Sequence, residues 1–92
     1  MWSYDFTSLA PALYGKYARV PLKPFAGTIG CAPTAPGLHS VVSPHRFGDN
    51  LYFRDLAAGT TLYLPIEVAG ALLTVGDTHA AKGDGEVCRA AT

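Results

Sequence analysis

Residues 77–86 combine side chains that could carry out chemistry. Three carboxylates (Asp77, Asp84 and Glu86) and the imidazole of His79 lie within ten residues, separated by small residues and two glycines. Such a segment can curl around one point, and Zn²⁺, Mn²⁺ and Ca²⁺ accept this mixture of oxygen and nitrogen ligands. A carboxylate near a metal-bound water can also act as a general base in hydrolysis. The alternative is a solvated polar turn, because the spacing matches neither an EF-hand loop nor an HExxH motif.

A second polar segment occupies residues 44–55. Its Gly48-Asp49-Asn50 sequence is a turn signal. His45 and Arg46 could contact an anionic or carbonyl ligand, or they could be solvated loop residues. His39 stands among apolar residues, and we expect it to be structural rather than a ligand.

Glycine and proline determine which elements can position these residues. The 10 Gly and 7 Pro are spread through 92 residues, so long helices cannot fit between them. The sequence therefore predicts a mainly β protein of short antiparallel strands and hairpins. Short strands are expected at residues 26–31 and 39–43, and an edge strand at residues 2–6, where aromatic residues alternate.

A hairpin is the clearest structural expectation. Two β-rich runs, residues 60–68 and 71–77, are separated by Ala69-Gly70, which is typical of a two-residue turn. Pro65 cannot donate to a ladder, so the first run should form an edge or bulged strand. The second run should deliver the polar segment that begins at Asp77.

Composition excludes several classes of protein. The formal net charge is zero, which disfavours nucleic-acid binding. The apolar runs are far shorter than the ~20 residues of a membrane-spanning helix, and the first residues do not resemble a secretory signal. We therefore expect a cytoplasmic protein that binds neither nucleic acid nor membrane, with Cys31 and Cys88 as free buried thiols.

The charge content is low for so short a chain. Charged residues make up 15% of the sequence, against roughly 25% in an ordinary soluble domain, while 49% of residues are hydrophobic. A chain of this size buries only about 60% of its unfolded surface. Its apolar surface should therefore meet a partner, or the chain should be part of something larger.

Motifs spread over residues 20–88 resemble the N-terminal part of the acetamidase/formamidase family. They are Val20-Pro21-Leu22 with Pro24-Phe25, Gly27-Thr28-Ile29-Gly30, Ala32-Pro33, Asn50 within the second polar segment, Leu56-Ala57-Ala58-Gly59-Thr60, Leu62-Tyr63-Leu64-Pro65, Gly70-Ala71-Leu72, and Gly76-Asp77-Thr78-His79-Ala80-Ala81 leading into Gly83-Asp84-Gly85-Glu86-Val87. The resemblance implies a β-rich α+β enzyme that hydrolyses short linear amides, such as formamide or acetamide, to the acid and ammonia. Members are longer and oligomeric, so residues 1–92 are expected to form one partial, incomplete domain.

The resemblance also implies a site. The family places a Gly-Asn-x-Asp motif and a Gly-Asp-x-His motif together at a divalent metal ion, here expected to be Zn²⁺ or Ca²⁺. Carried over, Asn50, Asp77 and His79 become candidate metal ligands. Asp77, Asp84 and Glu86 become candidates for proton transfer.

Three residues depart from the family pattern. Asp49 replaces a glycine, Tyr52 replaces the aspartate of Gly-Asn-x-Asp, and Lys82 replaces a glutamine. A phenol does not substitute for a carboxylate ligand at neutral pH, since its ordinary pKa is near 10. A cation beside the site should weaken metal binding by charge repulsion. The sequence after Cys88 also departs from the family pattern, so the C-terminal part of the domain is expected to be missing.

These observations leave three hypotheses. The first is metal-assisted hydrolysis of a small amide. The second is an inactive remnant that acts as a structural or self-association module, as a homo-oligomer or with the missing part. The third is a small metal-binding β module. A cysteine nucleophile is disfavoured because neither cysteine has an obvious activating histidine nearby in the sequence.

Overall fold

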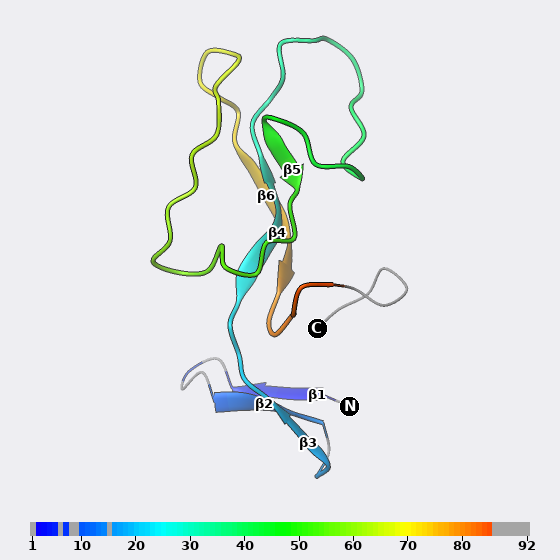
Figure 1. Cartoon of the computed structure of the whole chain (residues 1–92), viewed down its shortest axis with the longest axis vertical. Helices are drawn as coiled ribbons and strands as arrows, with labels where there is room; N and C mark the ends of the chain where they lie inside the picture. Colours follow the sequence, from blue (N-terminus) through cyan, green and yellow to red (C-terminus); the bar gives the residue numbers. More distant parts are fainter. Residues whose placement is uncertain (1, 6, 8–9, 15, 86–92) are drawn as a thin grey trace.

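The computed structural model describes residues 2–5, 7, 10–14 and 16–85. These residues form two antiparallel three-stranded sheets, one after the other along an elongated molecule of 50 × 29 × 17 Å (Figure 1). They contain strands, turns and loops, as the mainly β prediction requires. In this described part, no helix has the length and apolarity to cross a membrane.

The N-terminal sheet has the strand order β1-β2-β3. Its strands are β1 (Trp2–Asp5), β2 (Ala10–Tyr14) and β3 (Ala18–Val20). The β1–β2 register is irregular between Ser3 and Asp5, and the Asp5 carboxylate accepts the Thr7 N–H at 2.9 Å. The predicted edge strand at residues 2–6 is confirmed as β1.

The second sheet places β4 (Phe25–Gly30) between β5 (Gly48–Asn50) and β6 (Thr74–His79). Thr28 of β4 pairs with Asn50 on one side and with Gly76 on the other. The central strand therefore brings the two polar segments of the sequence to its opposite edges. The strand expected at residues 26–31 is confirmed as β4.

The ladder between β4 and β6 is interrupted at one position. Pairing runs on either side of Gly27 and Asp77 but does not include them. Asp77 adopts a left-handed backbone, with φ of 48°, and the Gly27 carbonyl instead accepts the Tyr52 N–H at 2.9 Å. A Cβ on Gly27 would lie 2.5 Å from the Asp77 carbonyl oxygen, so the close approach at this point requires glycine.

The predicted hairpin of residues 60–68 and 71–77 is wrong. A turn does form at Gly70, where the Ala71 N–H donates to the Val68 carbonyl, but residues 60–68 form no strand, and β6 pairs with β4 instead. Pro65 has no N–H to donate, and Glu67 instead binds the Thr34 backbone N–H and hydroxyl. Tertiary contacts to the 31–47 loop thus replace local strand pairing.

The strand expected at residues 39–43 is also wrong. This segment is a series of bends. The Ser40 hydroxyl accepts the Val42 N–H at 3.2 Å, and the His39 ring lies 2.7 Å from the Ala35 carbonyl. Such local bonds from side chain to backbone compete with a ladder.

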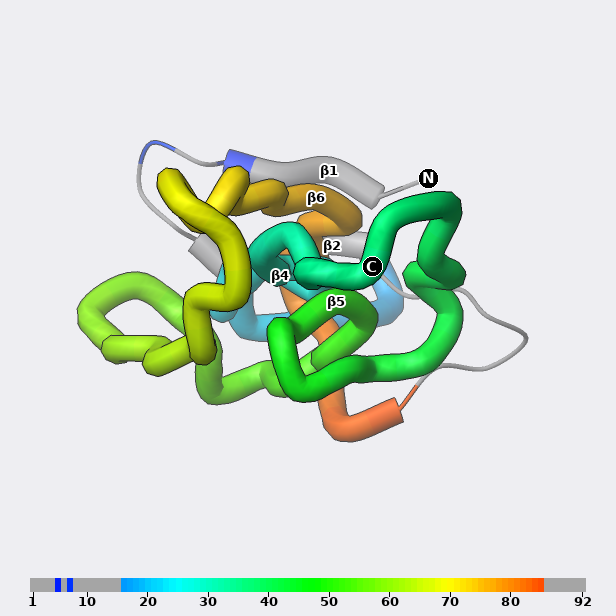
Figure 2. The backbone as a smooth tube through the Cα atoms, turned by 90° about the horizontal axis from the view of Figure 1, so that it is seen from above, coloured from blue at the N-terminus to red at the C-terminus, as the bar shows by residue number. Residues whose placement is uncertain are grey.

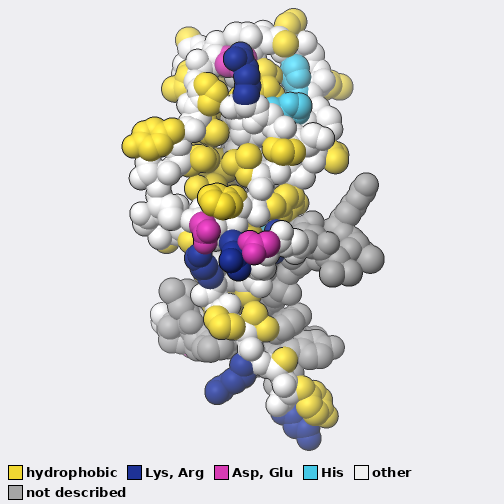
Figure 3. Space-filling view, in the orientation of Figure 1, with side chains coloured by type: hydrophobic (Ala, Val, Ile, Leu, Met, Phe, Trp, Pro, Cys, Tyr) yellow, Lys and Arg dark blue, Asp and Glu magenta, His cyan; other side chains and the backbone are white. Residues whose placement is uncertain are grey.

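The core is small and centred on β4. Its buried apolar side chains are those of Phe25, Cys31 and Phe47. The 31–47 and 51–73 loops pass on opposite sides of β4, as the view from above shows (Figure 2). Cys31 is a buried free thiol, as predicted, whereas Cys88 lies outside the described residues. Many large apolar side chains remain exposed over this half of the molecule (Figure 3).

Candidate functional site

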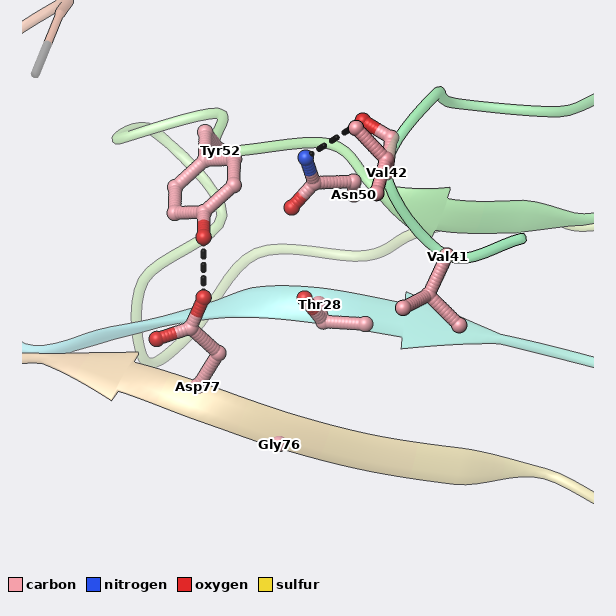
Figure 4. Close-up of a pocket in the computed structure, with 7 residues that line it drawn as sticks. All are labelled: Thr28, Val41, Val42, Asn50, Tyr52, Gly76 and Asp77. Carbon is pink, nitrogen blue, oxygen red and sulfur yellow. Dashed lines mark hydrogen bonds between the residues drawn. The ribbon is translucent and has the colours of Figure 1, made fainter. Parts of the chain in front are cut away.

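A cavity of about 450 Å³ opens beside the central strand. Its walls come from β4, β6, the end of β5 with the residues that follow it, and the 38–46 loop (Figure 4). The lining residues are Thr28, Val41, Val42, Asn50, Tyr52, Gly76 and Asp77. Polar groups thus line the floor and one wall, and two valines line the other wall.

Asn50 connects the polar part of the cavity lining to the wall formed by the two valines. Its side-chain amide donates to the Val42 carbonyl at 2.8 Å, which fixes the loop that carries Val41 and Val42 beside β5. The side-chain oxygen of Asn50 points into the cavity, toward the side on which the Thr28 hydroxyl lies (Figure 4). An acceptor and a hydroxyl are therefore available to a small polar ligand.

Asp77 lies across the cavity from Tyr52. The Tyr52 hydroxyl donates to Oδ2 of Asp77 (Figure 4), while Oδ1 of the same carboxylate is 3.8 Å from Nε2 of His79. The Asp77 side chain is 49% exposed and that of His79 only 6%. One carboxylate thus has each of its oxygens beside a different partner.

An aromatic cluster supports this arrangement from the side. The His79 ring centroid is 5.4 Å from that of Phe25 and 5.3 Å from that of Tyr52. Buried Lys82 places its Nζ 4.9 Å from the centroid of the Tyr52 ring and 5.8 Å from that of Phe25. These are cation–π distances, so the ammonium stabilises the position of the phenol ring.

The structure brings some of the predicted site residues together. Asn50 and Asp77 line one cavity, and His79 lies beside Asp77. Asp84 is exposed and forms an ion pair of 2.8 Å with Arg54, away from the cavity lining. Glu86 lies outside the described residues. Among the His, Cys, Asp and Glu residues that are described, no group of three or more is placed to hold a metal ion.

The remaining polar candidates have partners in the loops. The His45 ring stacks on Phe47 at 4.9 Å, with Nε2 3.0 Å from the Ser40 carbonyl. Arg46 forms an ion pair of 2.7 Å with Glu67. The pKa of the Glu67 carboxyl is held below its ordinary value, chiefly by the hydrogen bond from the Thr34 backbone N–H. The Thr34 hydroxyl and the Arg46 guanidinium lower it further. These contacts connect the loop that carries Val41 and Val42 to the 60–68 segment.

Sequence reasoning did not identify four of the lining residues. Thr28, Val41, Val42 and Gly76 form part of the cavity. Thr28 and Gly76 belong to the family motifs and pair with each other across β4 and β6. Knowledge of this strand register would have placed both residues beside Asn50 and Asp77. No sequence pattern marks Val41 and Val42, because their position depends on the bends of the 31–47 loop.

Comparison with known proteins identifies the family of this arrangement. Residues 37–92, more than half of the chain, match the Acetamidase/Formamidase family. The chain belongs to this family. The match includes Asn50, Tyr52 and Asp77, so the cavity lies mainly within the part that defines membership.

Named relatives agree with this assignment. The chain is 42% identical over 51 residues to a Schizosaccharomyces pombe protein named as a formamidase, covering 55% of this chain and 12% of that protein. It is 31% identical over 68 residues to the acetamidase of Mycolicibacterium smegmatis, covering 66% of this chain and 17% of that enzyme.

Solved structures show the same fold. An acetamidase from Bacillus halodurans superposes with a TM-score of 0.74 at 44% identity, over 80% of this chain and 25% of that one. An acetamidase from Yersinia enterocolitica superposes with a TM-score of 0.84 at 32% identity, over 99% of this chain and 26% of that one. The chain therefore spans about a quarter of the length of these solved relatives.

Proposed function

We propose that this chain provides part of the active site of an amide hydrolase that acts on short linear amides such as formamide or acetamide. The observation that carries the proposal is that Asn50 and Asp77, from two separate family motifs, line one cavity. Family membership gives the reaction class, since the relatives bear the names formamidase and acetamidase. A volume of about 450 Å³ has room for a small amide and several waters, each of which takes about 30 Å³.

We further propose a divalent metal ion, with Zn²⁺ or Ca²⁺ as candidates. Asp77 Oδ1 and His79 Nε2 are 3.8 Å apart, less than the sum of typical Zn–O and Zn–N bonds, which is about 4.2 Å. One ion could therefore contact both atoms, and the Asn50 side-chain oxygen is a further candidate donor. Such an ion would supply Lewis acidity, polarising the amide carbonyl and acidifying a water molecule.

The residues of the chain have distinct roles in this proposal. Asn50 and Thr28 orient the amide through hydrogen bonds, and Val41 and Val42 exclude water from one side of it. Asp77 is the cavity carboxylate, and its Oδ2, the oxygen not assigned to the ion, can accept a proton from water beside the Tyr52 hydroxyl and pass it to the departing ammonia. Asp84 and Glu86 stay candidates for proton transfer, with Asp84 facing solvent beside Arg54.

Ammonia release tests the function. The full-length polypeptide that carries this sequence should release ammonia from formamide or acetamide, and a chelator should reduce the rate until Zn²⁺ or Ca²⁺ is restored. Asp77→Asn should lose at least about 100-fold in rate, the lower range for loss of a general base. Absence of ammonia with every added metal would contradict the proposal.

A second candidate is a catalytically inactive module that associates with itself or with a longer relative. The observation that favours it is the replacement of a family carboxylate by Tyr52, together with the half-exposed Asp77. The same assay separates the two candidates, because the module would assemble without releasing ammonia.

Two finer properties of the whole protein are also proposals. We propose an α+β architecture, in which helices add to the strands described above, and a cytoplasmic location. The family resemblance supports the first. Far-ultraviolet circular dichroism of the full-length polypeptide and cell fractionation test them.

A further inference from the structure

We propose that Tyr52 is a positioning residue that fixes the Asp77 carboxylate so that Oδ1 faces His79. This inference rests on the proposed function, because it assigns Oδ1 and His79 Nε2 to the metal ion. It gives Tyr52 a role that its replacement of the family aspartate does not suggest from sequence alone. The phenol remains outside the ligand set and acts through the carboxylate.

The first support is the division of work between the two carboxylate oxygens. Tyr52 donates to Oδ2, and Oδ1 lies 3.8 Å from Nε2 of His79. A half-exposed carboxylate has several rotamers available to it, and the hydrogen bond to Oδ2 selects the one that presents Oδ1 to the imidazole. A carboxylate that is held in this way loses less conformational entropy when it binds an ion.

The second support is that the phenol itself is held. The Lys82 ammonium lies 4.9 Å from the centroid of the Tyr52 ring, and the His79 ring lies 5.3 Å from it at an interplanar angle of 50°. Burial of Lys82 makes its cation–π contact stronger than an exposed one. Tyr52 can therefore position Asp77, because its own ring is confined on more than one side.

The third support comes from the backbone at both ends of the bond. Tyr52 and Asp77 have left-handed φ values of 46° and 48°, a conformation that is disfavoured for a bulky residue such as tyrosine and better tolerated by aspartate. The Tyr52 N–H binds the Gly27 carbonyl, beside the interrupted pair in the ladder. Strain of this kind persists where the surrounding structure enforces it, and it often marks functional sites.

The test replaces only the hydroxyl. Tyr52→Phe keeps the ring against Lys82 and His79 but removes the donor, and Tyr63→Phe is the matched control because Tyr63 is 89% exposed. Both variants and the parent are prepared in the full-length polypeptide. Zn²⁺ affinity is measured by calorimetry, and the ¹³C resonance of the Asp77 carboxyl is followed without metal.

The expected result is specific to Tyr52. Tyr52→Phe should weaken Zn²⁺ binding about 10- to 100-fold, the range for loss of a partner that orients a ligand, and should shift the Asp77 resonance. Tyr63→Phe should change neither. Saturating Zn²⁺ should restore most of kcat for amide hydrolysis in Tyr52→Phe, since a defect in positioning is overcome by mass action.

Three results overturn the inference, and they are distinct from an absence of ammonia release. An unchanged Asp77 resonance in Tyr52→Phe, or a Zn²⁺ affinity equal to that of the parent, removes the positioning role. A parent protein that binds no metal also overturns it. If the parent binds Zn²⁺ and Tyr52→Phe weakens that binding while no ammonia is released, the inference stands and the proposed hydrolase function fails.

Discussion

At the scale of single residues, the site depends on contacts that join distant positions of the sequence. Tyr52 and Asp77 are 25 residues apart and share a hydrogen bond, and Lys82 covers the phenol ring. The Lys82 ammonium, which the sequence suggests would repel a metal ion, faces the rings of Tyr52 and Phe25. Two departures from the family pattern thus contact each other.

Gly27 gives a direct test of this close packing. A Cβ at this position would lie 2.5 Å from the Asp77 carbonyl oxygen and 3.1 Å from two atoms of the His79 ring. Gly27→Ala should therefore lower the free energy of unfolding by about 1–3 kcal/mol, the usual cost of overpacking. If Asp77 and His79 hold the proposed ion, Zn²⁺ affinity should fall as well, because both residues must move. Urea denaturation and calorimetry measure the two effects.

Gly76→Ala is the matched control on β6, since a Cβ there meets no atom within 4 Å. It should change the free energy of unfolding by much less than Gly27→Ala. Equal destabilisation by the two substitutions would contradict the assigned contact.

Residue types predicted part of the site and spatial contacts determined the rest. The spacing of polar residues and the family motifs pointed to Asn50, Asp77 and His79, which the structure brings to one region. The donor role of Tyr52 could not be predicted, because both Tyr52 and Asp77 adopt a left-handed backbone where they meet. Neither residue type favours that conformation as glycine does.

At the scale of elements, β4 organises the site and the loops complete it. The short strands β5 and β6 pair with opposite edges of β4, while the 31–47 loop supplies the valine wall. Glu67 fixes that loop, since its nearly buried carboxylate binds Thr34 and Arg46. Removal of this carboxylate should therefore loosen the loop that carries the two valines of the cavity wall.

The Glu67 contacts predict a pH dependence of stability. The pKa of this carboxyl is lowered in the folded protein, chiefly by the backbone N–H of Thr34. Its stabilising effect is therefore complete above the unfolded pKa, near 4.5, and is lost as the pH falls through the lower folded pKa. Urea midpoints between pH 3 and pH 7 should fall more steeply toward acid for the parent than for Glu67→Gln.

The control for this measurement is Asp84→Asn, because Asp84 is 75% exposed and its ion pair with Arg54 faces solvent. It should leave the pH profile of the parent nearly unchanged. Parallel profiles of the parent and Glu67→Gln would show that this carboxylate does not stabilise the fold.

The predictions of elements succeeded where local sequence decided the structure. The β1 and β4 strands follow from alternating or β-favouring residues in short runs. The hairpin prediction failed because β6 pairs with the central strand β4 and not with the first run, which contains Pro65. Local propensity does not reveal which distant strand competes for pairing.

At the scale of the whole molecule, apolar surface remains uncovered. Leu72, Leu73 and Val75 are each more than half exposed, and β6 forms an edge of its sheet within the described residues. An edge strand with apolar side chains is a template for pairing with another chain. The solved relatives are about four times as long, so we propose that in a complete family fold other segments cover this edge.

The isolated 92-residue polypeptide should therefore self-associate. Light scattering coupled to size-exclusion chromatography should show dimers or larger species at micromolar concentration. Val75→Lys should shift the distribution toward monomer, because a lysine on an edge strand opposes pairing. Tyr17→Lys, at an exposed residue just before β3 of the other sheet, should not. A parent polypeptide that remains a stable monomer would contradict the prediction.

The pairing of β4 with β6 also determines when the cavity can form during folding. Thr74 pairs with Gly30, which lies 44 residues earlier in the chain, and the other pairs of this ladder are more distant still. The entropy of closing so long a loop must be paid before these contacts give any stabilisation, so folding of this sheet is expected to be slow. Asp77 reaches Tyr52 only after that closure. Competence for ligand binding should therefore appear with the last cooperative step of folding and not before it.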